Sequence, residues 1–407
     1  GGMPMSINTA LLCIGAGPEQ VPAIELGRRM GYRVVALDGN PQAPGLRCAD
    51  NGIVVDPRNI EAVISIAREV NASCIVPVPL GAVLTTVGAV NDAMGWQGIS
   101  YRSAVACTDK TVMRRALAKE GVIQPNFLLA HSPNDVRAAV QALGLPVVLK
   151  PVRGSGSRGV ALICSEGDLD LELVKAQYTG QFKVAGGMMV ESELPGSEYG
   201  VDAVVAGGEC TVLSVRVKVI CPPPHRVAIE YTGPIPISST LFVEVQTTIQ
   251  TAVRALELND CLVHADILID VQKSSVSLIE ISGRPSGFGL GLEMLPACLG
   301  INPVEQMIRM LLGQSFSFKP RMARVGRLKG LFDRPGKLVA VGDLKAAREL
   351  QGVLSIHLPL AIGDRVPALH SGTDWWSAGV ASVVADNLQE LDALWLQMRD
   401  VLSLHVE

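Results

Sequence analysis

The stretch Leu145-Pro-Val-Val-Leu-Lys-Pro-Val-Arg-Gly-Ser-Gly-Ser-Arg-Gly-Val160 predicts a β-hairpin with a glycine-rich tip. An apolar strand ends at Lys150, and the chain returns as a second strand from residue 160 to 163. The glycines allow successive N–H groups to converge on an anion, and the two serines of the tip add hydroxyl donors. Lys150, Arg153 and Arg158 supply the positive charge that a polyphosphate requires. Taken alone, the tip fits a phosphate-binding loop and a solvated turn equally well.

Length and composition limit the classes of protein to consider. A chain of 407 residues with 48% hydrophobic and 18% charged residues is expected to form several globular lobes. A net charge of −4 argues against nucleic acid or an anionic membrane as a partner. Prolines and glycines interrupt the most apolar stretch, residues 76–90, so no membrane span is expected. The first residues lack a basic region followed by an apolar one, so no signal peptide is expected. Nine scattered cysteines without a C-x-x-C motif suit reduced thiols in a cytoplasm.

The N-terminal region predicts a small parallel sheet, because strands and helices alternate over residues 8–105. Gly15 and Gly17 follow the first strand, and Asp38 ends the second strand about twenty residues later. This is half of a dinucleotide-binding fingerprint, with Gln20 at the position of the third glycine. A nicotinamide or flavin site is one interpretation. A tight strand-to-helix turn is the interpretation we favour.

Two acidic residues are embedded in apolar strands further along the chain. Asp266 lies in the predicted strand 262–269 and Glu280 in the strand 275–281, with a short turn between them. The two side chains are therefore expected to face each other across a hairpin. Buried acids are costly unless a cation binds them, and two oxygen ligands beside phosphates suit Mg²⁺. A buried ion pair between Arg284 and one of the acids is the alternative.

Other segments frame these motifs. A helix is predicted to begin at Thr108-Asp-Lys110, and Lys218 lies on a strand that ends before Pro222-Pro-Pro-His225. The acidic stretch Glu191-Ser-Glu-Leu-Pro-Gly-Ser-Glu198 follows a strand and, taken alone, is expected to face water. From residue 323 onward, short strands and a terminal helix over 387–402 predict a small α+β lobe with no obvious chemistry.

In combination, the order and spacing of these motifs resemble the ATP-grasp superfamily over nearly the whole chain. The resemblance implies an α/β and α+β fold with a Rossmann-like N-terminal lobe, a two-subdomain ATP clamp and a small C-terminal α+β lobe. The expected domains are residues 1–107 for the Rossmann-like lobe and 108–188 for the small ATP-grasp subdomain with its glycine flap. Residues 189–318 are expected to form the large subdomain with the metal and substrate site, and 319–407 the C-terminal lobe.

The resemblance also implies roles for individual residues. Lys150 and Arg284 are the expected catalytic residues. The expected ATP-binding residues are Lys110, Lys150, Gly154, Ser155, Gly156, Ser157, Gly159, Glu191, Ser192, Glu193, Leu194, Glu198 and Lys218. The expected metal ligands are Asp266, Glu280 and Ser282, where Ser282 replaces the asparagine of the family's Glu-x-Asn-x-Arg pattern. The expected substrate-binding residues are His225, Arg284, Ser286, Gly287 and Phe288.

Lys218 followed by Pro222-Pro-Pro-His225 is most similar to L-amino acid ligases and the related biotin-carboxylase-type branch. The implied activity is an ATP- and Mg²⁺-dependent carboxylate–amine ligation through an acyl phosphate, with release of ADP and phosphate. Its partners would be small carboxylates and amines, without nucleic acid or membrane, in a cytoplasmic protein; a homodimer is the oligomeric state considered. Alternatives are a biotin-carboxylase-type enzyme, an NAD(P)-linked oxidoreductase that uses Gly15 and Asp38, and a non-catalytic ATP-binding protein suggested by Ser282.

Overall fold

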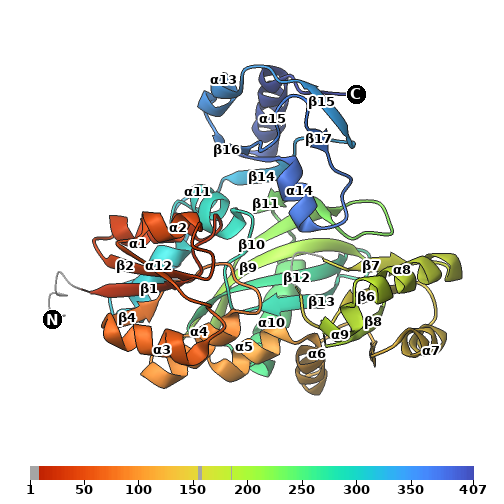
Figure 1. Cartoon of the computed structure of the whole chain (residues 1–407), viewed down its shortest axis with the longest axis horizontal. Coiled ribbons are helices and arrows are strands. Elements are labelled where there is room, and N and C mark those ends of the chain that lie inside the picture. Colours follow the sequence, from red (N-terminus) through yellow and green to blue (C-terminus); the bar gives the residue numbers. More distant parts are fainter. Residues whose placement is uncertain (1–8, 155–157, 185) are drawn as a thin grey trace.

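The computed structural model describes residues 9–154, 158–184 and 186–407, which form four β-sheets with helices packed against them (Figure 1). The largest sheet is antiparallel and has eight strands in the order β13-β12-β9-β10-β11-β14-β18-β16. A parallel four-stranded sheet, a second four-stranded sheet and a small three-stranded sheet accompany it. The combination of parallel and antiparallel sheets confirms the predicted α/β and α+β class.

The N-terminal lobe is the parallel sheet, in the order β3-β2-β1-β4. Its first strand is buried along its whole length, as an uninterrupted apolar sequence predicts for the centre of a parallel sheet. The predicted alternation of strands and helices is confirmed, whereas the short elements α2 and β3 are not evident from the sequence pattern. The lobe contains β1 (Ala10–Ile14), α1 (Val21–Arg29), β2 (Arg33–Asp38), α2 (Pro44–Cys48), β3 (Asn51–Val54), α3 (Ile60–Glu69), β4 (Ala72–Ile75), α4 (Leu84–Met94) and α5 (Tyr101–Thr108).

The second lobe carries the Lys150 hairpin in a sheet with the order β5-β8-β6-β7. Val147 pairs with Ile163, which confirms the strands predicted on both sides of the glycine-rich tip. Its elements are α6 (Lys110–Lys119), β5 (Phe127–Ala130), α7 (Pro133–Leu143), β6 (Val147–Pro151), β7 (Ala161–Ile163), α8 (Glu166–Tyr178), α9 (Gln181–Val184) and β8 (Met188–Ser192). Because β8 lies between β5 and β6, we propose that this lobe ends after Ser192 rather than at residue 188.

The first five strands of the central sheet include β12 and β13, which carry the two predicted metal acids. The predicted hairpin of β12 and β13 is confirmed, and β12 also pairs with β9. Helix α10 starts at the Ser238 cap and packs its apolar face, including Val245 and Ile249, into the core beneath these strands. The elements are β9 (Ser197–Ala206), β10 (Glu209–Ile220), β11 (Ala228–Gly233), α10 (Ser239–Ala255), β12 (Cys261–Asp270), β13 (Ser275–Ser282), the π-helical turn η1 (Leu290–Met294), α11 (Leu295–Leu299) and α12 (Pro303–Leu311).

The C-terminal lobe continues the central sheet, because β14 pairs with β11 on one side and with β18 on the other. Its elements are β14 (Val325–Gly330), β15 (Gly336–Ala340), α13 (Leu344–Glu349), β16 (Val353–His357), β17 (Arg365–Val366), α14 (Gly372–Ala378), β18 (Val380–Ala385), α15 (Leu388–Leu402) and β19 (His405–Val406). The terminal helix is confirmed, and the strand before it, β18, starts at Val380. A helix precedes it because Ser371 caps α14 by accepting the Asp374 N–H.

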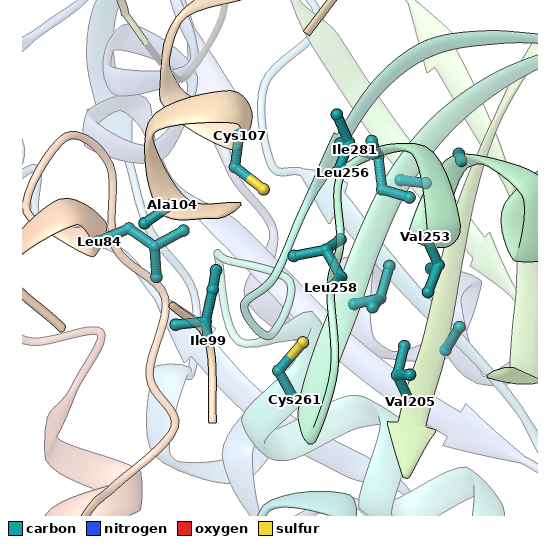
Figure 2. Packing of buried hydrophobic residues seen from close by; sticks show 14 of the residues in the cluster. Leu84, Ile99, Ala104, Cys107, Val205, Val253, Leu256, Leu258, Cys261 and Ile281 are labelled. Carbon is teal, nitrogen blue, oxygen red and sulfur yellow. The ribbon is translucent and has the colours of Figure 1, made fainter. Parts of the chain in front are cut away.

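One apolar core joins the N-terminal lobe to the central sheet (Figure 2). Leu84 and Ile99 of the N-terminal lobe are buried in the same cluster as Leu258, which lies just before β12. A Cβ at Gly283 would lie 2.7 Å from Ile99 Cδ1, so only glycine lets the end of β13 approach this core. Burial of each large apolar side chain contributes about 1.5–3 kcal/mol. The core therefore holds the segment that contains Arg284 firmly against the N-terminal lobe.

No helix in the part of the chain that the structure describes is both long and apolar enough to cross a membrane. The nine cysteines are free thiols. Burial raises the pKa of the Cys13, Cys74 and Cys107 thiols to about 12, which disfavours their reactive thiolate forms. These thiols therefore belong to the apolar cores.

Candidate active site

A cavity, which we name the hinge cavity, lies where the second lobe meets the central sheet. Lys150 comes from the end of β6, Lys110 from the first position of α6, and Glu198 from the start of β9. The structure thus brings most of the predicted ATP-binding and metal-binding residues together. They are Lys110, Lys150, Gly154, Glu191, Ser192, Glu193, Leu194, Glu198, Lys218, Asp266 and Glu280, with Arg158 and Arg226 beside them.

Glu191 is buried between two cations in the wall of the hinge cavity. Lys150 Nζ lies 2.8 Å from Glu191 Oε1, and Arg114 Nη2 lies 3.2 Å from Glu191 Oε2. Burial alone would raise the pKa of Glu191, but Lys150 and Arg114 hold it below its usual range. The ionised carboxylate therefore fixes the Lys150 ammonium at the strand end. Glu191 itself is only 2% exposed, so any contact between this wall and a nucleotide base would come from the residues that follow Glu191.

Lys218 connects Glu198 to Asp266 on the central sheet. Its Nζ lies 3.3 Å from Glu198 Oε2 and 3.3 Å from Asp266 Oδ1, while Arg226 donates to the other oxygen of Glu198. Burial would lower the pKa of Lys218, but Asp266 and Glu198 raise it above its usual range. Burial would likewise raise the pKa of Asp266, but Lys218 and His264 hold it below its usual range. Asp266 is therefore ionised at neutral pH, as a metal ligand must be.

Asp266 and Glu280 are direct partners in the β12–β13 register, as their spacing predicts. A bulge next to this pair lets both Ile279 and Glu280 line the hinge cavity. Among the described residues, Arg284 forms an ion pair with neither acid, which argues against the predicted alternative. No group of three or more His, Cys, Asp or Glu side chains in these ranges is arranged to hold an ion. Two carboxylates beside space for phosphate oxygens nevertheless fit Mg²⁺, with the nucleotide and water completing its shell.

Ser282 contributes less than the family pattern implies. It is buried and does not line the hinge cavity; it lines a neighbouring cavity together with Cys107, Glu280 and Arg284. Ser282 lies on β13 two residues after Glu280, but outside the cavity that Glu280 and Asp266 share. We infer that the two carboxylates are the main protein ligands.

The predicted glycine flap joins β6 to β7. Ser155, Gly156 and Ser157 lie outside the described residues. Lys110 Nζ donates to the Gly154 carbonyl oxygen at 3.2 Å, which ties the start of the flap to α6. Gly159 has a φ of +68° and a Cβ there would lie 2.7 Å from Gln181 Nε2, so this position requires glycine.

A second cavity of about 370 Å³, which we name the interlobe cavity, adjoins the first. Glu19 and Gln20 of the N-terminal lobe form one wall, and Arg284 and Phe288 form another. The third side is formed by α14, through Gly372, Thr373 and Trp375. The C-terminal lobe therefore contributes to the site, although its sequence shows no obvious chemistry. Lys218, Asp266 and Glu280 line both the hinge cavity and the interlobe cavity. The predicted metal acids therefore lie where the two cavities meet.

Two predicted substrate-binding residues lie elsewhere. His225 forms a β-bridge with Ala161 and packs its ring 4.7 Å from that of His370, outside the residues that line the two cavities. Ser286 is fully buried, and its hydroxyl donates to Asp202. His225 and Ser286 thus connect secondary-structure elements to one another instead of lining the cavities. Gly287 and Phe288, in contrast, do line the interlobe cavity, as does Arg284.

The Gly15–Gly17 turn is occupied by the protein's own side chains. Asp38 Oδ2 accepts the N–H of Ala16 at 2.9 Å, and Gln20 Oε1 accepts the N–H of Gly17 at 2.8 Å. Gln20 also donates to the Pro79 carbonyl at 2.8 Å. The amides that would hold a dinucleotide pyrophosphate are therefore satisfied internally. The geometry supports the tight-turn interpretation over an NAD(P) site.

Several polar side chains in or near the candidate site are absent from the sequence-based expectations. Arg114 lies four residues after Lys110 on α6, so helical periodicity could have placed both on one face. Arg216 lies two residues before Lys218 on β10, where strand alternation gives the same signal. Glu19 and Arg226 come from loops, and only the folded chain brings them to the cavities.

Comparisons with known proteins agree with this geometry. Residues 143–290 match the ATP-grasp domain model, and residues 331–407 match the model of the L-amino acid ligase C-terminal domain 2. The protein y4rH of Sinorhizobium fredii is 25% identical over 381 residues, which cover 91% of this chain and 77% of that protein. A formate-dependent phosphoribosylglycinamide formyltransferase of Nitratidesulfovibrio vulgaris is 32% identical over 200 residues. That alignment covers 47% of this chain and 49% of the formyltransferase.

Solved structures share the fold over the whole chain. The L-amino acid ligase of Bacillus licheniformis superposes with a TM-score of 0.80 at 18% identity, covering 99% of both chains. Phosphoribosylglycinamide synthetase of Anaerococcus prevotii superposes with a TM-score of 0.74 at 19% identity, covering 98% of this chain and all of that one. At these identities the superpositions show the fold alone, while the two domain models match the sequence itself. Residues 143–290 therefore form an ATP-grasp domain, and residues 331–407 form a C-terminal domain of the L-amino acid ligase type.

Proposed function

We propose that this protein is an ATP-dependent carboxylate–amine ligase that joins amino acids through an acyl phosphate, as an L-amino acid ligase does. The observation that carries the proposal is the shared wall of the two cavities. Asp266 and Glu280 belong to both, so a phosphoryl group held in the hinge cavity would face a carboxylate bound in the interlobe cavity. The matched C-terminal domain supports this choice among ATP-grasp activities.

The hinge cavity suits the phosphates of ATP. Lys110, Lys150 and Arg158 place three cations along its wall. Transfer of a phosphoryl group requires mainly alignment and charge neutralisation, which fixed cations provide. Glu191 keeps the Lys150 ammonium in place, so little reorganisation is needed when phosphate arrives.

ATP and Mg²⁺ are the proposed cofactors. Asp266 and Glu280 would hold the ion, and Ser282 lies two residues after Glu280 on β13. When bound, Mg²⁺ supplies charge neutralisation and alignment of the transferred phosphoryl group. Before an ion binds, the ion pair with Lys218 favours the ionised form of Asp266.

The interlobe cavity suits an amino acid zwitterion. Arg284 donates only to the Pro285 carbonyl oxygen, and among the described residues it has no acidic partner. Glu19 accepts the N–H of Phe288 and has no basic partner in the same ranges. An unneutralised cation and an unneutralised anion thus line one cavity, which complements a carboxylate and an ammonium group.

Two steps follow from this arrangement. A carboxylate oxygen of the first substrate attacks the γ-phosphorus, the bond to the β,γ-bridging oxygen breaks, and ADP leaves. The amine nitrogen of the second substrate then attacks the acyl carbon, loses one proton, and displaces phosphate to form the amide. Arg284 stabilises the negative charge that develops on the acyl oxygen. Exclusion of water by the flap and by α14 would protect the acyl phosphate from hydrolysis.

A matrix of amino acid pairs tests the proposal. The purified protein is incubated with ATP, Mg²⁺ and each pair, and ADP is measured together with the mass of any new product. The proposal predicts ADP formation that requires two substrates and yields a dipeptide-like amide. Arg284→Ala should abolish it, whereas Arg321→Ala, in a groove between α11 and α12 away from both cavities, should not.

A carboxylase of the biotin type gives a different result in the same assay. Bicarbonate alone, and not an amine, would then stimulate ADP formation, and no amide would appear. With an active pair in hand, ¹⁸O in the substrate carboxylate should appear in the released phosphate, because the acyl oxygen leaves with it. Unlabelled phosphate would contradict the acyl-phosphate step. Cytoplasmic location and a homodimer stay predictions.

A further inference from the structure

A buried polar cluster lies behind the predicted metal acids. Asp202, Arg216 and Ser286 are 4%, 1% and 0% exposed. Arg216 forms an ion pair with Asp202 and also donates to Ser286 Oγ at 2.8 Å, while Ser286 donates to Asp202 Oδ1 at 2.5 Å. Burying such an ion pair costs desolvation energy that apolar packing would avoid. The cluster therefore needs a reason beyond the stability of the sheet.

Two strand glycines make room for this cluster. Gly200 is the register partner of Arg216, and a Cβ there would lie 2.8 Å from Arg216 Nε. A Cβ at Gly233, on β11, would overlap the Arg216 side chain. Glycine weakens the interior of a strand. Two strand positions thus lack a side chain, and the side chain of Arg216 occupies the space.

His264 connects the cluster to the cavities. It lies two residues before Asp266 on β12 and therefore on the same face of the strand. Its Nδ1 lies 2.7 Å from Ser286 Oγ, and its Nε2 lies 3.6 Å from Asp266 Oδ2. Arg216 Nη2 also lies 3.3 Å from Nδ1, and because a guanidinium group can only donate, Nδ1 accepts there and Nε2 is the N–H of the ring. The inner nitrogen of the ring is fixed, and the outer nitrogen is directed at Asp266.

We propose that His264 is a positioning residue that holds the carboxylate of Asp266, and that Asp202, Arg216 and Ser286 fix its ring for this task. The inference rests on the proposed function, in which Asp266 binds Mg²⁺. A ligand carboxylate that is already oriented loses less freedom when it binds a metal. Removal of such orienting partners weakens metal affinity by about 10–100-fold.

Two substitutions of His264 separate its two contacts. The amide nitrogen of glutamine occupies the place of Nε2, so His264→Gln keeps the contact with Asp266. The amide of asparagine occupies the place of Nδ1, so His264→Asn keeps only the contact with Ser286. Isothermal titration of the full chain with ADP at increasing Mg²⁺, and with ADP in EDTA, measures metal binding without any turnover. We expect His264→Asn to raise the half-saturating Mg²⁺ about tenfold and His264→Gln to stay near wild type.

Ser286→Ala tests the cluster itself, with Ser277→Ala as its matched control, because Ser277 is also buried but lies away from His264. Ser286→Ala should resemble His264→Asn, and Ser277→Ala should resemble wild type. ADP affinity in EDTA should be the same in all of them, since a positioning role affects only the metal. If Ser286→Ala fails to fold, the two His264 variants decide the question alone.

Wild-type Mg²⁺ half-saturation in both His264→Asn and His264→Gln would overturn the inference. An equal loss of ADP affinity with and without Mg²⁺ would also overturn it, because the effect would then be one of general structure. If Mg²⁺ does not change ADP binding in the wild type, the proposed function fails and this inference with it. The wild-type titration therefore distinguishes the two failures.

Discussion

Lys150 has two roles in the proposed mechanism. Its ammonium lines the hinge cavity, where it would contact phosphate, and it also neutralises the buried Glu191. The sequence places Lys150 at the end of an apolar strand, and the structure buries it there. Lys150→Ala should therefore reduce ADP formation by at least about 100-fold and also cost about 2 kcal/mol of stability, with Arg114 left as the partner of Glu191. ADP release and urea unfolding check both effects.

Lys175→Ala is the matched control, since Lys175 lies in the same lobe and pairs with Glu172 at an exposed site. It should change neither ADP formation nor stability by a measurable amount. A folded Lys150→Ala protein with wild-type ADP formation would remove Lys150 from the mechanism.

Glu191 also predicts a pH dependence of stability. Its pKa in the folded protein lies below the ordinary value of 4.5, so its ion pairs contribute fully above that value. The contribution is lost as pH falls through the folded pKa. The difference in Tm between wild type and Glu191→Gln should therefore be largest near neutral pH and shrink below about pH 4. Thermal melts from about pH 7 to about pH 3 measure it. A difference that does not change with pH would show that Glu191 is not an ionised partner.

At the scale of elements, the β12–β13 hairpin positions the two carboxylates of the proposed metal site. Because Ser282 lies outside the hinge cavity, Ser282→Ala should raise the half-saturating Mg²⁺ for ADP formation by less than about threefold. Asp266→Asn should reduce ADP formation by about 100-fold or more. A larger effect of Ser282→Ala than of Asp266→Asn would place the ion elsewhere on the strand.

The turn between β6 and β7 should respond to nucleotide. The sequence of this turn is rich in glycine, and ATP phosphates would accept hydrogen bonds from its backbone N–H groups. Hydrogen exchange of a peptide that covers this turn should slow when ATP and Mg²⁺ are added, while exchange in α15 should not change. Identical exchange with and without nucleotide would indicate that the turn does not close on phosphate.

At the scale of the whole molecule, the C-terminal lobe is part of the central sheet rather than an appendage. Deletion of the chain after residue 318 would remove β14 from the edge of β11 and expose apolar residues such as Leu290 and Tyr231. We therefore expect the truncated protein to aggregate, because an uncovered strand edge promotes association. Size-exclusion chromatography checks this. A soluble monomer that still forms ADP would show that the lobe is independent.

Sequence motifs predict the hinge cavity better than the interlobe cavity. Lys150, Asp266 and Glu280 lie at strand positions, where alternation and spacing determine which side chains meet. Glu19, Phe288 and α14 meet only because three lobes pack together, and no local pattern records such contacts. Ser286 illustrates the opposite error, since a serine beside a motif can serve the core. Local periodicity thus predicts the helices and strands but not the contacts between lobes.

The central claim is that Asp266 and Glu280 hold the Mg²⁺ on which phosphoryl transfer to a carboxylate depends. The most direct measurement is ADP formation at increasing Mg²⁺, with an active amino acid pair, for wild type, Asp266→Asn and Glu280→Gln. We predict no ADP without Mg²⁺ in the wild type, and a loss of about 100-fold in either variant that added Mg²⁺ does not restore. ADP formation that is independent of Mg²⁺, or unchanged in both variants, would contradict the mechanism.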